Sequence, residues 1–79
     1  MRIHLSRPVI ELLRKSGEEG SPLRRAVEDL WRDPRPADAL NTPERPDRYE
    51  IFRAGYWIIC EIDKSGGETV VRVTAIEAN

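Results

Sequence analysis

The chain has 79 residues, of which 34% are charged, and a formal net charge of −1 at pH 7. This length fits a single domain, 1–79, with a modest core, and the small net charge provides no overall attraction to nucleic acid. One cysteine excludes an intramolecular disulfide, and neither a membrane-spanning apolar run nor a signal-peptide pattern is present, so we expect a cytoplasmic protein.

The first half of the chain predicts a short strand followed by two helices. Residues 2–5 alternate in polarity, and Ser6 with Pro8 then marks a helix start. A second start signal stands at 21–22. The apolar residues that follow recur with helical spacing: Leu23, Ala26, Val27, Leu30 and Trp31. Asp33-Pro34 ends this helix, because the residue before proline avoids the α region. We expect the two helices to form an antiparallel hairpin.

Residues 35–47 contain three prolines and few apolar side chains. They predict an ordered, irregular loop in which Ala39 and Leu40 dock on the core. This loop carries Arg35 and Arg45 beside the sheet, with Arg48 just after it.

The strongest local pattern is a β-hairpin within 47–63, whose turn is Ala54-Gly55. Alternation divides its side chains into two sets. The more apolar set is expected to face the helices: Tyr49, Ile51, Tyr56, Ile58, Cys60 and Ile62. The other set is expected on an open face: Glu50, Phe52, Trp57, Ile59 and Glu61. If the two faces are exchanged, Phe52 and Trp57 belong to the core instead.

Residues 68–76 predict a third strand, with Val71, Val73 and Ala75 on one face. Both of its faces are largely apolar, which is typical of a central strand. The predicted fold class is therefore α+β: a two-helix hairpin packed on one face of a small, mostly antiparallel sheet of three to four strands. The other face of the sheet is the expected working surface.

The chemistry-bearing residues of this sequence are few. His4 is the only histidine and no cysteine cluster exists, so no metal site or other cofactor is expected. Glu50 and Glu61 lie on neighbouring strands, where they form either an acid–base pair or a solvated face. Four arginines lie near the same sheet and could bind phosphate or remain surface groups: Arg45, Arg48, Arg53 and Arg72. Phe52 and Trp57 would form an exposed apolar patch that suits a protein partner.

Three segments together resemble toxins of the RelE/ParE superfamily of bacterial type II toxin–antitoxin systems. They are LRRAVEDLWRDPRPADAL, RYEIFRAGYWIICEID and ETVVRVTAIEAN. The resemblance implies a cytoplasmic α+β toxin neutralised by a protein antitoxin. One branch of the superfamily cleaves mRNA on the ribosome without a metal ion, and the other inhibits DNA gyrase. A homodimer is a further alternative.

Carried over residue by residue, the resemblance gives Arg53 and Arg72 as the basic residues nearest to catalytic positions. Arg45 and Arg48 are then the candidate RNA-phosphate ligands, and Phe52 and Trp57 the candidate partner-binding residues. The usual basic positions of the family are occupied here by other residues: Glu50, Phe52, Trp57 and Asn79. The alternative function is therefore a catalytically inert protein-interaction module of the same fold.

Overall fold

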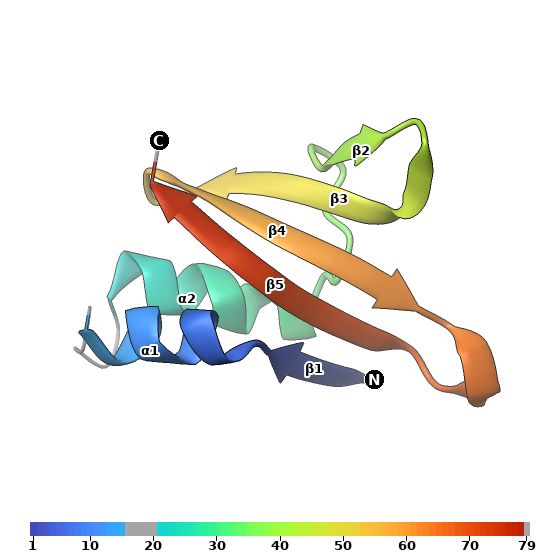
Figure 1. Cartoon of the computed structure of the whole chain (residues 1–79), viewed down its shortest axis with the longest axis horizontal. Coiled ribbons are helices and arrows are strands. Elements are labelled where there is room, and N and C mark those ends of the chain that lie inside the picture. Colours follow the sequence, from blue (N-terminus) through green and yellow to red (C-terminus); the bar gives the residue numbers. More distant parts are fainter. Residues whose placement is uncertain (16–20, 79) are drawn as a thin grey trace.

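Two helices and five strands form the part of the chain that the computed structural model describes, residues 1–15 and 21–78 (Figure 1). In chain order they are β1 (Arg2–Leu5), α1 (Arg7–Lys15), α2 (Pro22–Glu28), β2 (Leu40–Thr42), β3 (Arg45–Arg53), β4 (Tyr56–Asp63) and β5 (Val70–Ala78). A 3₁₀ turn, Asp29–Trp31, extends α2, and a second, Ser65–Gly67, links β4 to β5. None of the described helices is long and apolar enough to cross a membrane.

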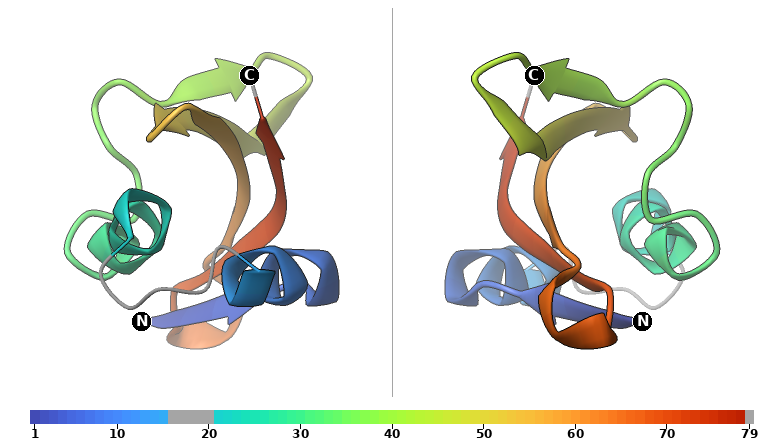
Figure 2. Two further views of the ribbon diagram at one scale, coloured as in Figure 1. Left: turned by 90° about the vertical axis from the view of Figure 1, so that its left-hand side faces the viewer. Right: turned by 90° about the vertical axis from the view of Figure 1, so that its right-hand side faces the viewer.

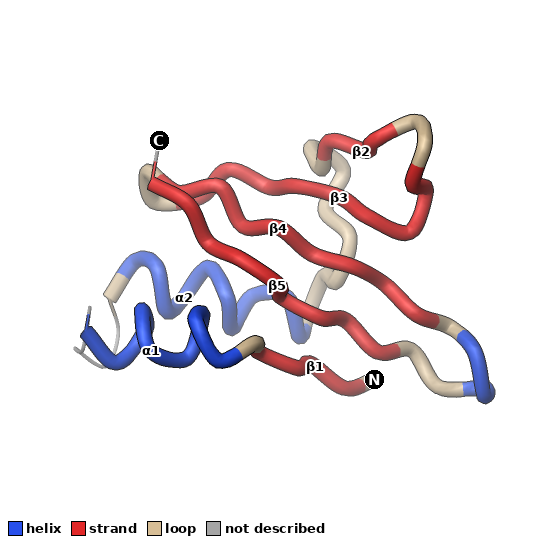
Figure 3. Tube along the Cα trace, viewed as in Figure 1, coloured by secondary structure: helices blue, strands red, loops and turns tan. Residues whose placement is uncertain are grey.

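All five strands belong to one mixed sheet with the order β1-β5-β4-β3-β2 (Figure 3). β1 pairs with β5 in parallel, and the other neighbours are antiparallel. The predicted sheet of three to four mostly antiparallel strands under a helical hairpin is therefore wrong. The missed strand, β2, has three residues and a register shift against β3, so it carries no period-2 signal. The segment read as an irregular loop contains this strand and the start of β3.

The two helices do not form an even layer over one face of the sheet. α2 lies on the concave side, against β3, whereas α1 continues the line of β1 along the edge of β5 (Figures 1 and 2). Ser6 fixes this arrangement. Its backbone N–H donates to the carbonyl of Val73 at 3.1 Å, and its hydroxyl donates to the carbonyl of Thr74 at 2.9 Å. The end of β1 and the start of α1 are thus both tied to the middle of β5.

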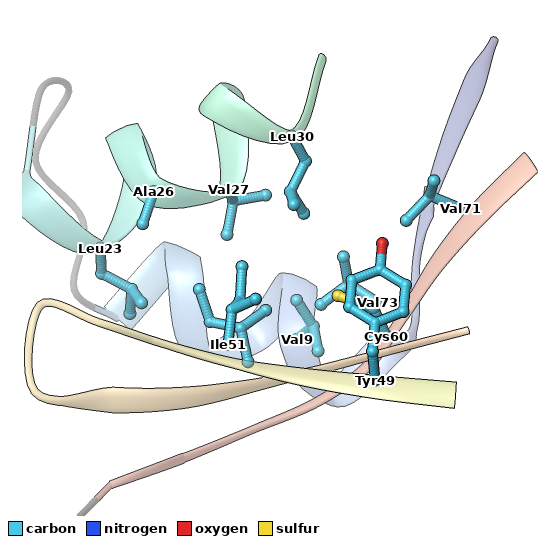
Figure 4. Packing of buried hydrophobic residues seen from close by; sticks show 11 residues of the cluster. Val9, Leu23, Ala26, Val27, Leu30, Tyr49, Ile51, Cys60, Val71 and Val73 are labelled. Atoms are coloured by element: carbon cyan, nitrogen blue, oxygen red, sulfur yellow. The ribbon is translucent and has the colours of Figure 1, made fainter. Parts of the chain in front are cut away.

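The core lies between α2, α1 and the concave face of the sheet (Figure 4). Its most deeply buried side chains come from every layer: Val9, Leu30, Tyr49, Ile51, Ile58, Cys60, Val71 and Val73. The predicted helix-facing set of the hairpin is confirmed, since Tyr49, Ile51, Ile58 and Cys60 are all in this cluster. Ile59, predicted on the open face, pairs with Glu50 outside this cluster but is only 6% exposed. The exchanged arrangement, with Phe52 in the core, is excluded because that ring is 41% exposed.

The predicted hairpin turn is also confirmed. Phe52 pairs with Trp57 and Arg53 with Tyr56, which leaves Ala54 and Gly55 as the two turn residues. Both have positive φ, 56° and 82°, as a type I′ turn requires. Alanine is strained there, because its Cβ crowds the backbone in the left-handed region.

A bulge in β5 changes which of its side chains face the helices. Cys60 pairs with Val73 and Ile59 with Ala75, so Thr74 is the extra residue. As a result Ile76, not Ala75, joins the core together with Val71 and Val73. The predicted grouping of Ala75 with those valines is wrong, because strict alternation takes no account of a bulge.

Two further packing predictions are wrong. Trp31 is 56% exposed, because the chain leaves α-helical geometry at Asp29 and the tighter 3₁₀ turn rotates this side chain away from the core. Leu40 is 55% exposed, because it lies on the edge strand β2, opposite Glu50. Ala39 packs on the core as expected.

Tyr49 joins the segment after α2 to the sheet. Its ring is fully buried, and its hydroxyl donates a hydrogen bond to the carbonyl of Pro34. The guanidinium of Arg35 stacks over the same ring at 5.5 Å and donates to the carbonyl of Pro46. The loop is ordered by these contacts, which place Arg35 on the helix-facing side of β3.

Candidate functional site

A row of polar side chains crosses four strands on the open, convex face of the sheet. In the strand register, His4 on β1 lies opposite Arg72 on β5. Arg72 lies opposite Glu61 on β4, and Glu61 lies opposite Arg48 on β3. Side chains that are directly opposite in register project from the same face, so these four lie side by side. We call His4, Arg72, Glu61 and Arg48 the open-face row.

The alternation of each strand separates the row from the core. On β1, Ile3 and Leu5 pack towards the core while His4 is exposed. On β4, Cys60 is fully buried and Glu61 is on the other side. Neighbouring strands are about 4.8 Å apart, so His4 and Glu61 are separated by about 10 Å at the backbone, with Arg72 between them.

Arg45 adds a third arginine beside the row. It lies at the start of β3, and its Nη2 donates a 3.0 Å hydrogen bond to Oε1 of Glu61. The same guanidinium is 4.0 Å from Asp47. The Glu61 side chain is 28% exposed, so its carboxylate is held in place but remains reachable.

The other two arginines of the row have looser partners. Nη2 of Arg72 is 3.6 Å from Asp63, and Nη2 of Arg48 is 4.0 Å from Glu50. Exposed pairs at such distances contribute little free energy, so a phosphate oxygen can replace the carboxylate at small cost. Nε of Arg48 is buried and makes no hydrogen bond within the described residues.

Asp63 is held as an anion beside the row. The hydroxyl and the backbone N–H of Ser65 donate to its Oδ1 at 2.7 and 2.9 Å. These hydrogen bonds, together with the charge of Arg72, lower the pKa of Asp63. Asp63 therefore limits the positive potential at Arg72.

Arg53 does not belong to the row, although the sequence grouped it with Arg72. It is at the end of β3, on the same side of the strand as Tyr49 and Ile51 and not on the open face. It forms a bidentate ion pair with Asp38, with N–O distances of 2.7 and 2.9 Å. The hydrogen bond from Arg53 lowers the pKa of Asp38, and the same bond raises the pKa of Arg53. This arginine anchors the loop before β2.

Phe52 and Trp57 lie on the same open face, nearer the hairpin turn. Their ring centroids are 5.0 Å apart with an interplanar angle of 62°, an edge-to-face contact. Phe52 is four residues from Arg48 along β3, so about 13 Å separates the aromatic pair from the row. The pair and the row are two neighbouring parts of one surface.

His4 is the site residue that the sequence analysis missed. It was considered only as a metal ligand, because nothing local shows which strand β1 joins. The alternation of Ile3 and Leu5 does place His4 on the open side, but only the parallel pairing with β5 brings it to Arg72.

The row contains every group needed to transfer protons at a phosphodiester without a metal ion. It holds a carboxylate, an imidazole and cationic donors between and beside them. The described residues include no cluster of three or more His, Cys, Asp or Glu side chains that could hold a metal. Asn79, the remaining position compared with the toxin family, is outside the described residues.

Comparisons with protein-family models, curated proteins and solved structures found no match to this chain.

Proposed function

We propose that the chain is the toxin of a bacterial toxin–antitoxin pair and that it cleaves RNA, without a metal ion, at the open-face row. The observation that carries this proposal is the register that sets His4, Arg72 and Glu61 side by side on three adjacent strands. The sequence resemblance supports the biological setting, which is a cytoplasmic toxin acting on ribosome-bound mRNA and neutralised by a protein partner.

In the proposed reaction the RNA itself supplies the nucleophile. The Glu61 carboxylate accepts the proton of a ribose 2′-hydroxyl as its oxygen attacks the adjacent phosphorus. The bond from phosphorus to the 5′-oxygen breaks, and the His4 imidazolium donates a proton to that leaving oxygen. The products are a 2′,3′-cyclic phosphate and a 5′-hydroxyl, so no water, metal or redox partner is consumed.

Arg72 binds the phosphate between these two groups. Attack and departure occur on opposite sides of phosphorus, so the base and the acid must stand on either side of the anion. In the strand order, β5 with Arg72 lies between β4 with Glu61 and β1 with His4, which suits this requirement. A cation there stabilises the charge that develops on the non-bridging oxygens.

Arg45 and Arg48 act as flanking groups. Arg45 holds Glu61 by its 3.0 Å hydrogen bond, which directs the carboxylate over the row. Arg48 is on the opposite side of Glu61 from Arg72 and binds the next phosphate of the chain. In this scheme the carboxylates Glu50 and Asp63 give up their loose partners when RNA binds.

The test uses purified chain in EDTA with two oligonucleotides that differ in one 2′-hydroxyl. We expect cleavage of an RNA oligonucleotide, with a 2′,3′-cyclic phosphate on the 5′ product, and no cleavage where the 2′-hydroxyl is replaced by hydrogen. His4→Gln should slow the reaction about 100-fold. Cleavage of the deoxy substrate at an equal rate would refute the mechanism. If cleavage requires ribosomes, two messages that differ in the same way, by one 2′-hydroxyl at the cleavage site, are compared in a translation extract.

A second candidate function is favoured by the Phe52–Trp57 pair, in which Phe52 is exposed and Trp57 is partly buried, because such a pair suits a non-catalytic module that binds a protein. Such a module predicts that Trp57→Ala weakens a purified complex by about 2 kcal/mol or more. The control is Lys64→Ala, a substitution of an exposed residue. Growth arrest in bacteria that persists in His4→Gln but is lost in Trp57→Ala would favour this function, or a target such as DNA gyrase, over RNA cleavage.

A further inference from the structure

Arg2 is a second chemistry-bearing residue on the open side of β1. Residues 2–5 alternate in exposure, so the side chain of Arg2 shares the open face with His4. In the strand register, Arg2 lies opposite Val70 on β5, two residues before Arg72. At the spacing of a β-sheet, the backbone of Arg2 is about 7 Å from His4 and about 8 Å from Arg72. Arg2 is therefore a direct neighbour of the open-face row.

The guanidinium of Arg2 has no hydrogen-bond or ion-pair partner among the described residues. Its backbone N–H donates to the carbonyl of Thr69 at 2.9 Å, which fixes the start of β1 against β5. On the same face the nearest carboxylate by register is Asp63, about 10 Å away across two strand spacings, and Ser65 already donates two hydrogen bonds to it. Glu68, before the start of β5, is exposed and forms no ion pair with Arg2. Arg2 is thus an exposed cation that is open to an incoming anion.

The order of base and acid in the proposed reaction gives the bound RNA a direction. The attacking 2′-hydroxyl belongs to the nucleotide on the 5′ side of the scissile phosphate, and the leaving 5′-oxygen belongs to the nucleotide on its 3′ side. Glu61, the proposed base, is on β4, and His4, the proposed acid, is on β1. The 5′ nucleotide therefore lies over β4 and the 3′ nucleotide over β1, so the RNA runs from β3 towards β1.

β1 forms one edge of the sheet, so its open side carries the last strand groups that the 3′ part of the RNA meets (Figure 3). We propose that Arg2 binds the phosphate on the 3′ side of the scissile phosphate, while Arg48 binds the phosphate on its 5′ side. The separation of Arg2 from Arg72 is one that a single nucleotide spans, and a guanidinium is suited to bidentate contact with phosphate oxygens.

This inference rests on the proposed function and deepens it in two ways. It assigns a substrate-binding residue outside the row, and it defines the substrate as a single strand with at least one phosphate on each side of the cut. Cleavage is then internal to the RNA and has a fixed polarity on the sheet.

Arg7 gives the competing path for the 3′ segment. It stands at the start of α1, where its side chain is 90% exposed and 3.6 Å from Glu11. RNA that left β1 towards α1 would contact Arg7 and not Arg2. Because Arg7 already has a carboxylate partner and Arg2 has none, the structure favours Arg2.

The test uses the full chain in EDTA and a tetranucleotide with three phosphates, in which only the second nucleotide carries a 2′-hydroxyl. A methylphosphonate linkage removes the charge of either the first or the third phosphate. Binding is measured by fluorescence anisotropy with the all-deoxy forms, and cleavage with the forms that carry the 2′-hydroxyl. We expect Arg2→Gln to weaken binding of the fully charged tetranucleotide about tenfold and to reduce the slope of log K against log salt by about 0.7.

With a neutral third phosphate, Arg2→Gln should have no effect on binding, whereas with a neutral first phosphate its effect should persist. Arg48→Gln should show the reverse pattern. Arg25→Gln, which removes an exposed arginine of α2 on the other side of the sheet, is the matched control and should bind every tetranucleotide as the parent does.

The inference is overturned if the parent does not bind the tetranucleotide, or if Arg2→Gln binds the fully charged form as the parent does. It is also overturned if the effect of Arg2→Gln disappears with the neutral first phosphate, or if Arg7→Gln, and not Arg2→Gln, is coupled to the third. The proposed reaction fails separately: the expected coupling in binding without cleavage of the form with the 2′-hydroxyl would refute the reaction and support the assignment of Arg2.

Discussion

Arg45 donates a 3.0 Å hydrogen bond to Glu61, sixteen residues further along the chain. This bond fixes a carboxylate on the open face of the sheet at the position where Arg72 and Arg48 flank it on the neighbouring strands. A carboxylate held by a guanidinium has a fixed orientation, so it accepts protons from a defined direction. The proposed chemistry depends on this placement more than on any single residue type.

The positions of Arg53 and Arg72 lead to opposite expectations for their variants. Arg72→Ala should lower RNA cleavage about 100-fold, because it removes the cation between the proposed base and acid. Arg53→Ala should leave the cleavage rate within about twofold of the parent, because Arg53 pairs with Asp38 away from the row. Rates on one RNA oligonucleotide, with circular dichroism to check folding, measure both. Equal losses would mean that the row is misassigned.

Substitution of Ala54 should stabilise the hairpin. Ala54 has φ of 56°, a conformation that glycine and asparagine adopt at lower cost. We expect Ala54→Asn to raise the free energy of unfolding by about 1 kcal/mol, since Asn-Gly is the preferred type I′ pair. Urea denaturation measures the change. Ala75→Asn, on a strand, is the contrasting variant and should destabilise; a loss of stability in Ala54→Asn would argue against the turn conformation.

The hydroxyl of Tyr49 should contribute to the free energy of unfolding, which can be measured with a variant that keeps the ring and lacks the hydroxyl. Tyr49→Phe leaves the carbonyl of Pro34 without its donor at a partly buried position. The expected loss is about 1–3 kcal/mol in the free energy of unfolding. Tyr56→Phe is the matched control, because the Tyr56 hydroxyl makes no hydrogen bond within the described residues. Similar effects of the two substitutions would show that the Pro34 contact contributes nothing.

Alkaline pH should destabilise the chain through its buried thiol and phenol. Burial raises the pKa of Cys60 from 9.0 to about 11 and also raises the pKa of Tyr49. Between pH 9 and 11 the unfolded chain therefore releases protons that the folded chain retains. Stability is fully present below pH 9 and falls as pH rises towards 11, by up to about 1.4 kcal/mol per pH unit for each group.

Urea denaturation at pH 8, 9, 10 and 11 measures this slope, and Cys60→Ala should make it shallower. A wild-type slope that is unchanged by Cys60→Ala would contradict the assignment to the thiol.

The sequence was sufficient for the features that depend on neighbouring residues. The hairpin register, its turn and its buried face follow from alternation around Ala54-Gly55, and Val27 and Leu30 follow from helical spacing. Features that depend on distant segments could not be predicted. The bulge at Thr74, the parallel pairing of β1 and the three-residue strand β2 leave no periodic signal.

The site divides in the same way. Arg72, Arg45 and Arg48 were predicted as basic groups near the sheet, and Glu61 as a member of an acid–base pair. The predicted partner of Glu61 was Glu50. Glu50 lies outside the open-face row, and its carboxylate is next to Arg48 instead. His4 belongs to the open-face row because β1 pairs with β5. Arg53 does not, because Asp38 in the loop before β2 forms an ion pair with it.

The most direct test of the central claim compares wild type, Glu61→Gln and Glu77→Gln in a ribosome-containing translation extract, with induction of each gene in bacteria. Glu77 is on β5, opposite Trp57 and on the open face of the sheet, as Glu61 is. Its substitution controls for the loss of one surface carboxylate. The assignment of Glu61 as the base predicts that wild type and Glu77→Gln cut the message and arrest growth. Glu61→Gln should be at least about 100-fold slower and should permit growth. Intact message with wild type, or equal cleavage by Glu61→Gln, would contradict it.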